Sequence, residues 1–324
     1  MRILILGAGA IGSVFGGLLA EAGNEVYLIG RDPHMHTIRH RGLVIEGIWG
    51  DHHIYNVHAY TLLENIPHNE TLDVVLLTVK SYDTQAVLEA FNNISGVMPP
   101  VVSLQNGLGN LERIEHIAGR EKTIGGRVIF GVEYTGPGRV RVTVSADNTL
   151  IGILPGAADA KGFVHLLADN FTRAGIPTRV TENIISELWG KVLYNCSLNA
   201  LASLLDCNYG TLLTSRYTRS MITCIIQEIY AVAEKKNIEL AWRTPEAYAE
   251  CLFGELIPRT SGHHPSMLQD IHRGKKTEID ALNGAVVRLA REYDLPAPTN
   301  ETITELISAK ELLCKTTAPM TKNC

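Results

Sequence analysis

The sequence predicts an α/β protein with a doubly wound parallel sheet and a C-terminal all-helical domain. Short apolar runs alternate with helical patterns in the first half of the chain, which is typical of βαβ units. Residues 72–79 form a run that is apolar except for Asp73 and Thr78, as expected for a strand buried on both faces. Strand patterns end near residue 181, and only helical periodicity follows. We therefore expect an α/β domain over residues 1–181 and a helical domain over residues 182–324.

The individual elements follow from the apolar pattern. The predicted strands cover residues 3–6, 26–29, 72–79, 101–104, 125–132, 140–144, 150–154 and 177–180. The predicted helices cover residues 11–22, 161–174, 183–205, 212–236, 244–255, 277–293 and 300–313. Gly136-Pro137-Gly138 predicts a turn. Residues 315–324 have no periodicity, and we expect them to fray.

The composition of the 324 residues is that of a globular protein, with 45% hydrophobic and 19% charged residues. A net charge of −5 gives no indication of a polyanionic partner, so we expect no binding of nucleic acid. The first residues lack the pattern of a signal peptide, and no run reaches about 18 apolar residues. We therefore expect a cytoplasmic protein without a membrane span. The sequence does not give the oligomeric state, and a homodimer stays an open alternative.

The cysteines and histidines show no pattern of a metal site, and we expect no metal. The six cysteines have neither C-x-x-C spacing nor a zinc-ligand pattern; they are Cys196, Cys207, Cys224, Cys251, Cys314 and Cys324. Scattered cysteines of this kind are typical of buried or incidental thiols in a reducing cytosol. We interpret the pairs His52-His53 and His263-His264 as loop residues, because neighbours in a regular element rarely point at one metal.

A glycine-rich turn follows the first predicted strand. Gly7-Ala8-Gly9-Ala10-Ile11-Gly12 matches G-x-G-x-x-G and opens the first helix. Gly7 allows the tight turn, Gly9 lets the backbone approach a pyrophosphate, and Gly12 allows close packing of helix and strand. The first backbone N–H groups of the helix then face the phosphates. The pattern predicts a Rossmann-type dinucleotide-binding domain.

The end of the second predicted strand favours NADP over NAD. NAD-binding domains carry an acidic residue about 20 residues after the glycines, whereas this chain has Ile29, Gly30 and Arg31 there. An arginine pairs with a 2′-phosphate through two parallel hydrogen bonds, and a carboxylate would repel it. Asp32 weakens this argument, but we expect it to face the loop. The alternative is that Arg31 is a solvated loop residue.

Polar residues also stand at the ends of two further predicted strands. Lys80 follows the run of residues 72–79, and Asn106 lies in the turn Gln105-Asn106-Gly107. The carboxyl ends of parallel strands face the ligand crevice, so either side chain could contact ribose, nicotinamide or substrate. We expect the catalytic cleft between this edge and the helical domain. The alternative is a loop lysine and a turn asparagine.

A polar stripe runs along the otherwise apolar helix predicted over residues 183–205. Glu187, Lys191, Asn195, Asn199 and Ser203 recur every four residues and share one face. Asparagine is a poor helix former, so two in register need a reason. One reason would be a solvent-exposed edge with a Glu187–Lys191 pair. We favour a polar cavity, since the other faces of the helix are apolar.

A second polar cluster covers residues 265–270 and 274–280. Thr277 could cap the next helix, with Asp280 three residues later as a capping-box-like partner. This explanation leaves Glu278 without a role.

Together the motifs resemble those of the ketopantoate reductase (2-dehydropantoate 2-reductase) family. The resemblance rests on the glycine turn, Gln105-Asn106-Gly107, the helix with Lys191, Asn195 and Asn199, and the segments 266–270 and 276–280. These motifs occur in the family's order between residues 7 and 283, and the later ones are the more specific. The resemblance implies NADPH-dependent reduction of ketopantoate to pantoate, as in pantothenate and coenzyme A synthesis.

The resemblance also implies roles for single residues. Lys191 would be the proton donor in contact with substrate, and Glu278 would lie at the reacting end of the site. Substrate contacts are implied for Asn106, Lys191, Asn195, Asn199 and Ser266. Cofactor contacts are implied for the glycine turn, Arg31, Lys80, Asn106 and Glu278. One further substrate-binding asparagine of the family has no clear match near Asn208 and Tyr209.

The chemistry of ketone reduction fits these residue types. Hydride transfer to the ketone carbon leaves negative charge on the oxygen, which a lysine can hydrogen-bond and protonate, best if desolvation lowers its pKa. Amide and hydroxyl side chains can bind hydroxyl and carboxylate groups without adding charge. Two alternatives stay open: a relative that reduces a different 2-oxo acid, and a regulatory module that binds NADP without turnover.

Overall fold

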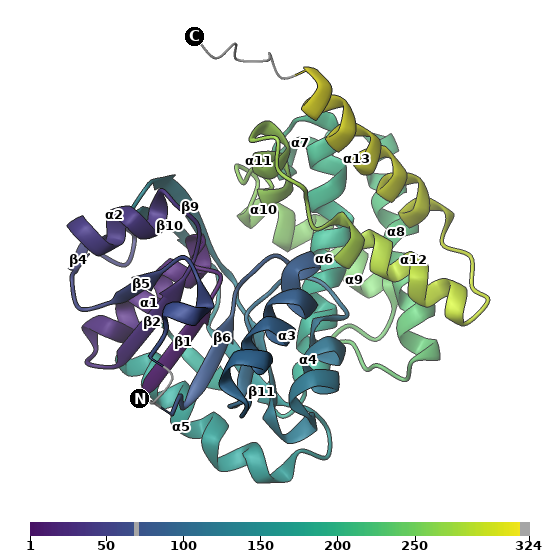
Figure 1. Cartoon of the computed structure of the whole chain (residues 1–324). Coiled ribbons are helices and arrows are strands. Elements are labelled where there is room, and N and C mark those ends of the chain that lie inside the picture. Colours follow the sequence, from purple (N-terminus) through teal and green to yellow (C-terminus); the bar gives the residue numbers. More distant parts are fainter. Residues whose placement is uncertain (68–70, 318–324) are drawn as a thin grey trace. The chain divides into compact units, whose positions relative to one another are not determined.

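The computed structural model describes residues 1–67 and 71–317 (Figure 1). By their internal contacts these residues form two compact units. The first comprises the described residues of 1–105 and 109–187, and the second comprises residues 106–108 with the described residues from 188 on. The domain boundary predicted near residue 181 falls between β12 (Thr178–Val180) and α6 (Ile184–Leu205).

An eight-stranded sheet forms the centre of the first unit, in the order β12-β11-β8-β7-β6-β1-β2-β5. Besides β12, its strands are β1 (Arg2–Leu6), β2 (Glu25–Ile29), β5 (His58–Tyr60), β6 (Val74–Leu77), β7 (Val101–Ser103), β8 (Thr123–Arg127) and β11 (Thr149–Ile153). Neighbouring strands pair in parallel except β8 and β11. The strand order reverses at β1, which has β2 on one side and β6 on the other, as in doubly wound folds. The predicted fold class is confirmed.

Apolar residues on these strands and on five helices build the core of the first unit. The helices are α1 (Ala10–Glu21), α2 (His34–Arg41), α3 (Thr84–Ser95), α4 (Asn110–Ala118) and α5 (Lys161–Arg173). Apart from Arg2 at the start of β1, the central strands β1 and β6 are buried along their length, as their apolar sequences predict. Phe15 of α1 packs edge-on against Phe171 of α5, with ring centroids 5.2 Å apart.

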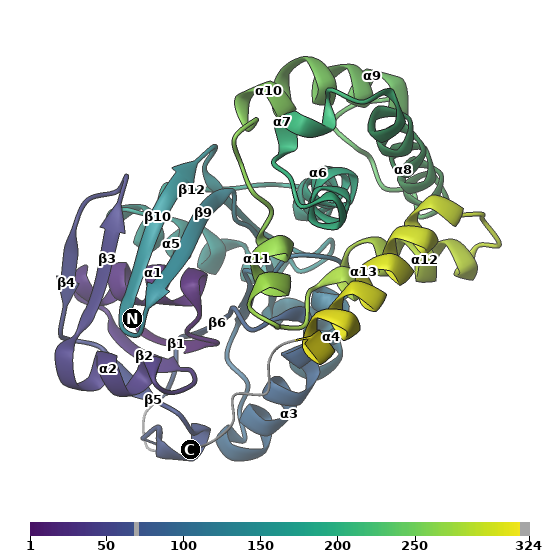
Figure 2. The ribbon, with the colours of Figure 1, turned by 90° about the horizontal axis from the view of Figure 1, so that it is seen from above.

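A second sheet, which the sequence did not reveal, has the order β4-β3-β10-β9. Its strands are β3 (Leu43–Gly47), β4 (His52–Ile54), β9 (Phe130–Gly136) and β10 (Arg139–Ser145), and Figure 2 shows them side by side. Helix α1 lies between the two sheets. A Cβ on Gly16 would lie 2.4 Å from Leu28 of the large sheet, and one on Gly17 would lie 2.8 Å from Ile45 of the small sheet. Both sheets therefore approach this helix closely.

The small sheet corrects two predictions. The single strand predicted over residues 125–132 is wrong, because β8 ends at Arg127 in the large sheet and β9 begins at Phe130 in the small one. His52 and His53 are not loop residues, since they lie in β4. His52 also pairs with Glu21 of α1, with Nδ1 2.6 Å from Oε2.

The second unit is helical. Beyond α6 it contains α7 (Tyr209–Leu212), α8 (Arg216–Lys235), α9 (Pro245–Cys251), α10 (Ile257–Arg259), α11 (Ser266–His272), α12 (Asn283–Glu292) and α13 (Pro298–Thr317). A π-helical turn over Leu252–Leu256 joins α9 to α10. Residues 315–317, expected to fray, complete α13, whereas residues 318–324, with Cys324, lie outside the described residues.

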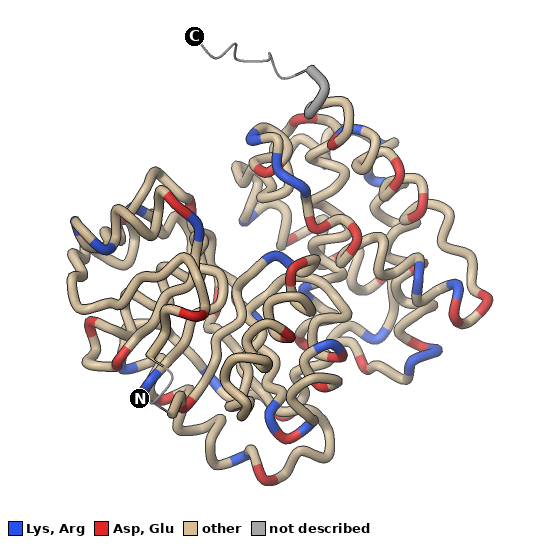
Figure 3. The backbone as a smooth tube through the Cα atoms, viewed as in Figure 1, with Lys and Arg blue, Asp and Glu red and all other residues tan. Residues whose placement is uncertain are grey.

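Helix α6 lies at the centre of this unit. It is seen nearly end-on in Figure 2, with other helices of the unit around it. Leu193, Cys196 and Leu198 have no exposed surface, so burial rather than amphipathic patterning explains the apolar sequence of this helix. Across the described part of the chain, no helix is both long and apolar enough to cross a membrane. Acidic and basic residues are interspersed along both units (Figure 3).

Candidate active site

The glycine turn connects β1 to α1 with the geometry of a phosphate cradle. Gly7 has φ +105°, and a Cβ there would lie 2.5 Å from the backbone nitrogen of Val79. A Cβ on Gly12 would lie 2.5 Å from the carbonyl oxygen of Gly7. Gly9 is different, because it is exposed and its Cβ would meet nothing closer than 3.9 Å. The space above Gly9 is open for a ligand, at the first N–H groups of α1. The turn fits a bound pyrophosphate.

Ala10 and Ile11 of the same turn form the first residues of α1, and both are half-buried. No acidic residue stands in the first turn of this helix. Its partial positive charge is therefore not neutralised by a carboxylate on that turn, which suits an anionic group.

Arg31 and Asp32 follow β2, and their side chains have different surroundings. The Arg31 side chain is 90% exposed, and its Nη2 lies 3.4 Å from Oδ2 of Asp83. The Asp32 carboxylate accepts a hydrogen bond of 3.0 Å from the backbone N–H of His36 in α2. The Asp32 carboxylate is therefore bonded to the first turn of α2, whereas the Arg31 guanidinium is mostly exposed beside Asp83.

Lys80 and Gln105 stand just beyond the ends of β6 and β7. Lys80 is half-buried and begins the 3-10 turn Ser81–Asp83. Gln105 is buried, and its amide nitrogen donates to the carbonyl of Val79 at 2.7 Å and to the Thr84 hydroxyl at 2.8 Å. Gln105 thus ties together the segments that follow two adjacent strands, which the sequence pattern alone did not indicate.

Further buried polar groups extend this contact. The Thr84 hydroxyl donates to Oδ1 of Asn110 at 3.1 Å, and the Asn110 amide donates to the Ser81 hydroxyl at 3.3 Å. These residues were not among the predicted ones. Thr84 and Asn110 each follow the nearest strand by seven residues, and their burial is not visible in the sequence, so no sequence signal indicated them.

Asn106 groups with the helical unit, although it follows a strand of the α/β unit in sequence. Next to it, Gly107 has φ +86°, and a Cβ there would lie 2.4 Å from the carbonyl oxygen of Ala281. The Leu108 N–H donates to the same oxygen at 2.8 Å. Ala281 in turn donates its N–H to the carbonyl of Glu278 at 3.0 Å. The structure thereby brings the Asn106 turn to the segment that contains Glu278.

The polar stripe lies on α6 as predicted, and its later members are buried. Asn199 is 5% exposed, and Ser203 is fully buried with its hydroxyl donating to the Asn199 carbonyl at 2.7 Å. Lys191 and Asn195 are half-buried. A purely solvent-exposed edge therefore does not describe this face of the helix.

Asn199 and Ser266 come together from helices that are far apart in the sequence. The Asn199 amide nitrogen lies 3.5 Å from the Ser266 hydroxyl, and its oxygen accepts from the Met267 N–H at 3.3 Å. Ser266 is the first residue of α11 and is exposed. An exposed hydroxyl beside a buried amide can bind a carboxylate or hydroxyl group of a ligand.

Glu278 is half-buried and precedes the 3-10 turn Ile279–Ala281. Of the capping-box interpretation only the part of Thr277 is confirmed, because its hydroxyl accepts a hydrogen bond of 3.2 Å from the Ile279 N–H, whereas Asp280 does not act as its partner. Asp280 pairs with Lys276 at 3.1 Å, and the buried Thr277 hydroxyl donates to the carboxylate of Glu311 in α13. This partner lies 34 residues away, so local spacing could not predict it.

Two hollows on the surface of the helical unit lie elsewhere. They have volumes of about 500 and 570 Å³ and share Arg219, Thr223 and Phe253 of the α8–α9 region. None of the predicted site residues lines either hollow. Among the described residues, no group of three or more His, Cys, Asp or Glu side chains could hold a metal ion.

A doubly wound sheet with this glycine turn is the architecture of a dinucleotide-binding domain. Two family models specify the class further. Ketopantoate reductase PanE/ApbA matches residues 3–156, and the C-terminal model of the same family matches residues 183–311. The chain therefore belongs to the ketopantoate reductase family, a family of oxidoreductases, and the predicted resemblance is confirmed.

Individual relatives agree with this assignment. A 2-dehydropantoate 2-reductase of Aquifex aeolicus is 41% identical over 96% of this chain and 97% of its own length. The crystal structure of a PanE/ApbA family ketopantoate reductase from Ralstonia eutropha has a TM-score of 0.85 at 30% identity, covering 97% of this chain and 100% of its own. D-mandelate dehydrogenase with NADH and anilino(oxo)acetate has a TM-score of 0.86 at 29% identity, covering 97% of this chain and 99% of its own. Family and neighbours indicate a nicotinamide cofactor.

Proposed function

We propose that the chain reduces ketopantoate to pantoate with NADPH and that Lys191 is the proton donor. The observation that carries this proposal is the face of α6 on which Lys191, Asn195 and Asn199 stand, with Ser266 at its buried end. The Aquifex aeolicus relative, named 2-dehydropantoate 2-reductase, supports the choice of substrate.

Ketone reduction needs a hydride for the carbon and a proton for the oxygen, and these come from different groups. NADPH, when bound, supplies the hydride for the ketone carbon. The Lys191 ammonium donates a hydrogen bond to the ketone oxygen and passes it a proton as negative charge develops there. Lys191 then regains a proton from solvent, so charge is balanced over one turnover.

The remaining residues bind and orient the substrate. Asn195 and Asn199 present amide groups to its hydroxyl and carboxylate oxygens, and the exposed Ser266 hydroxyl binds the carboxylate. Asn106 and Glu278 act at the reacting end, where Glu278 accepts a hydrogen bond from a substrate hydroxyl or orients the lysine ammonium. The backbone contacts through Ala281 support placing these two residues in one site.

Three residues of the α/β unit support NADPH rather than NADH as the cofactor. Arg31 is exposed at the end of β2, where a 2′-phosphate would lie, and Asp32 is bonded to the His36 N–H instead of facing a ribose. Lys80, beyond the end of β6, adds a second positive charge at the cofactor edge. The alternative cofactor is NADH, which is present in the structure of the neighbour D-mandelate dehydrogenase.

That neighbour also defines the second candidate function, the reduction of a different 2-oxo acid. In this chain both activities would use Lys191 as donor, so they differ only in the substrate that the asparagine face accepts. A regulatory module that binds NADPH without turnover is the candidate from another class. The position of the catalytic cleft, the cytoplasmic location of the protein and its possible assembly into a homodimer stay predictions.

One assay separates these candidates. Purified protein is mixed with NADPH, and its oxidation is followed after addition of ketopantoate, of phenylglyoxylate or of other 2-oxo acids. The proposal requires the highest kcat/KM for ketopantoate. A preference for phenylglyoxylate would assign the second candidate, and NADPH binding without oxidation by any 2-oxo acid would assign the regulatory module.

A further inference from the structure

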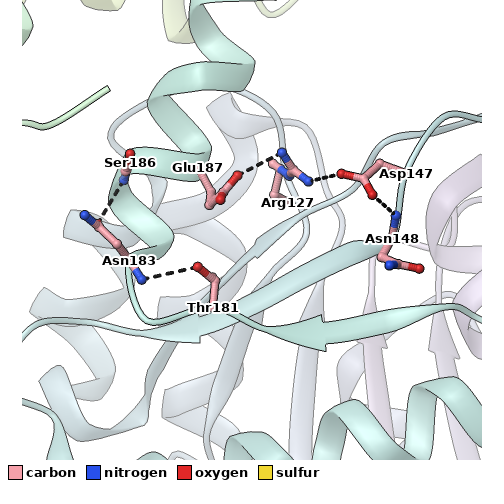
Figure 4. A network of polar contacts seen from close by, with 7 residues as sticks. All are labelled: Arg127, Asp147, Asn148, Thr181, Asn183, Ser186 and Glu187. Carbon is pink, nitrogen blue, oxygen red and sulfur yellow. Dashed lines mark hydrogen bonds and ion pairs between the residues drawn. The ribbon is translucent and has the colours of Figure 1, made fainter. Parts of the chain in front are cut away.

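An arginine of the α/β unit forms an ion pair with the first turn of α6, the helix that contains Lys191 (Figure 4). Arg127 is the last residue of β8, and its side chain is only 14% exposed. Its Nη1 lies 2.8 Å from Oε2 of Glu187 in α6, and its Nη2 lies 2.7 Å from Oδ2 of Asp147. One guanidinium therefore bridges a carboxylate of the helix and a carboxylate of the loop that precedes β11.

The same helix start is held by several other bonds. Asn183 caps α6, because its side-chain oxygen accepts from the Ser186 N–H at 3.1 Å, and its own N–H donates to the Thr181 hydroxyl at 3.2 Å. The Thr181 N–H donates to the carbonyl of Ile151 in β11 at 2.9 Å. The turn from Thr181 to Glu187 is thus fixed to the edge of the sheet through backbone, cap and ion pair.

The chain is continuous from this turn to the proposed proton donor. Lys191 follows Glu187 by four residues in the same helix, which is one turn, or about 6 Å along the axis. The helix is continuous from Glu187 to Lys191, so the direction of its first turn sets the direction of the turn that contains Lys191. Hydride and proton transfer need the ketone to be placed within a fraction of an ångström of both donors, and small misplacements are costly.

From these contacts we infer that Arg127 is a positioning residue, which holds the start of α6 through Glu187 and thereby orients Lys191 for proton transfer. This inference rests on the proposed role of Lys191. Arg127 itself needs no contact with substrate or cofactor to act in this way. Its second partner, Asp147, binds the other nitrogen of the guanidinium and does not belong to α6.

The chain offers a matched pair of conservative variants. Glu187→Gln keeps the size of the side chain but removes the charge that Arg127 holds on the helix. Asp147→Asn does the same to the other partner of the same guanidinium, away from the helix. Arg127→Met removes both contacts, and Arg127→Lys keeps the charge but loses the planar fork.

The expected results separate positioning from general stability. Glu187→Gln and Arg127→Met should slow single-turnover oxidation of NADPH by about 10- to 100-fold, with NADPH affinity unchanged. Asp147→Asn should retain the wild-type rate. The double variant Arg127→Met/Glu187→Gln should be no slower than Arg127→Met, because both changes break one contact. Equal rates for Glu187→Gln and the wild type, or equal losses for Glu187→Gln and Asp147→Asn, would overturn the inference.

A second measurement needs no substrate and so distinguishes this inference from the proposed function. Amide hydrogen exchange of residues 184–195 should accelerate in Glu187→Gln and Arg127→Met but not in Asp147→Asn. Unchanged exchange in all variants would show that Arg127 does not hold the helix, even if ketopantoate is reduced. If the wild type reduces no 2-oxo acid while hydrogen exchange responds as expected, the proposed function fails, but the conclusion that Arg127 holds the start of α6 is retained.

Discussion

The carboxylate of Asp32 accepts a hydrogen bond of 3.0 Å from the backbone N–H of His36, at the start of α2. It is the first acidic residue after β2, the strand whose end selects between NAD and NADP. This hydrogen bond ties one oxygen of the Asp32 carboxylate to the first turn of α2. The preceding residue, Arg31, is left 90% exposed beside Asp83.

Arg31→Ala should therefore weaken the binding of NADPH much more than the binding of NADH. The lost contact to a 2′-phosphate is charge-assisted, worth about 1.5–3 kcal/mol, which is roughly a ten- to hundredfold loss in affinity. Fluorescence titration with both cofactors measures the change. Asp83→Asn is the matched control, since it removes only the carboxylate beside Arg31 and should not weaken NADPH. An equal loss for both cofactors in Arg31→Ala would give Arg31 a structural role.

The glycine turn allows a test of the phosphate cradle. Gly9 has φ −81° and open space at its Cβ position, so Gly9→Ala should fold with a Tm near that of the wild type but bind NADPH at least about tenfold more weakly. Gly12→Ala is the contrasting variant, because its Cβ would lie 2.5 Å from the Gly7 carbonyl oxygen. It should lower the Tm. Normal NADPH affinity in Gly9→Ala would mean that the cofactor does not approach this turn.

The two asparagines of α6 should respond differently to substitution. Asn195→Ala should raise the KM for the 2-oxo acid strongly while the free energy of unfolding changes little. Asn199→Ala should raise KM and also destabilise the fold, by about 1–3 kcal/mol, because it leaves the buried Met267 N–H without its acceptor. Chemical denaturation and steady-state kinetics of both variants measure this contrast. A KM that stays at the wild-type value in both variants would exclude the asparagine face as the substrate site.

His34 should make the α/β unit less stable in acid. Its Nδ1 accepts from the Gly138 N–H at 2.8 Å and its Nε2 lies 2.9 Å from the Ser13 hydroxyl, so the ring is neutral in the fold. Burial lowers the pKa of His34 to about 4, below its usual 6.5. Its contribution to stability is thus complete above pH 6.5 and is lost as the pH falls through 4, by roughly 1–3 kcal/mol.

The test is the free energy of unfolding of wild type and His34→Gln between about pH 7 and pH 4. The wild type should lose more stability over this range than the variant does. Parallel pH dependences would show that other groups account for the acid sensitivity.

The sequence predicted those parts of the fold that repeat a strong local pattern. β1, β6 and α6 are long or uniformly apolar, and their predicted positions agree with the structure within a few residues. The small sheet was missed because β4 has only three residues, too few for an alternating pattern to show. β8 and β9 were merged because only two residues separate them, and the chain changes sheets there.

In the candidate site, too, the sequence predicted residues that repeat in a local pattern and missed those that depend on distant contacts. The spacing of Lys191, Asn195 and Asn199 was visible because a helix repeats about every 3.6 residues. The partners that hold the site residues in place were not visible, since they come from distant segments. Gln105 bonds to Thr84, Thr277 bonds to Glu311, and neither pair has a local signature.

The role of Lys191 is the central claim, and the pH dependence of kcat/KM for the wild type and Lys191→Ala tests it most directly. Lys191→Ala should fold and bind NADPH like the wild type, while turnover of ketopantoate drops by about 10²–10⁴, the usual contribution of a positioned general acid. In the wild type, kcat/KM should fall as the pH rises through the pKa of the lysine, because the donor must be protonated, and this alkaline limb should vanish from the residual activity of Lys191→Ala. A Lys191→Ala enzyme with near-normal kcat and an unchanged alkaline limb would contradict the account, and Glu278 would then be the next candidate for the acid.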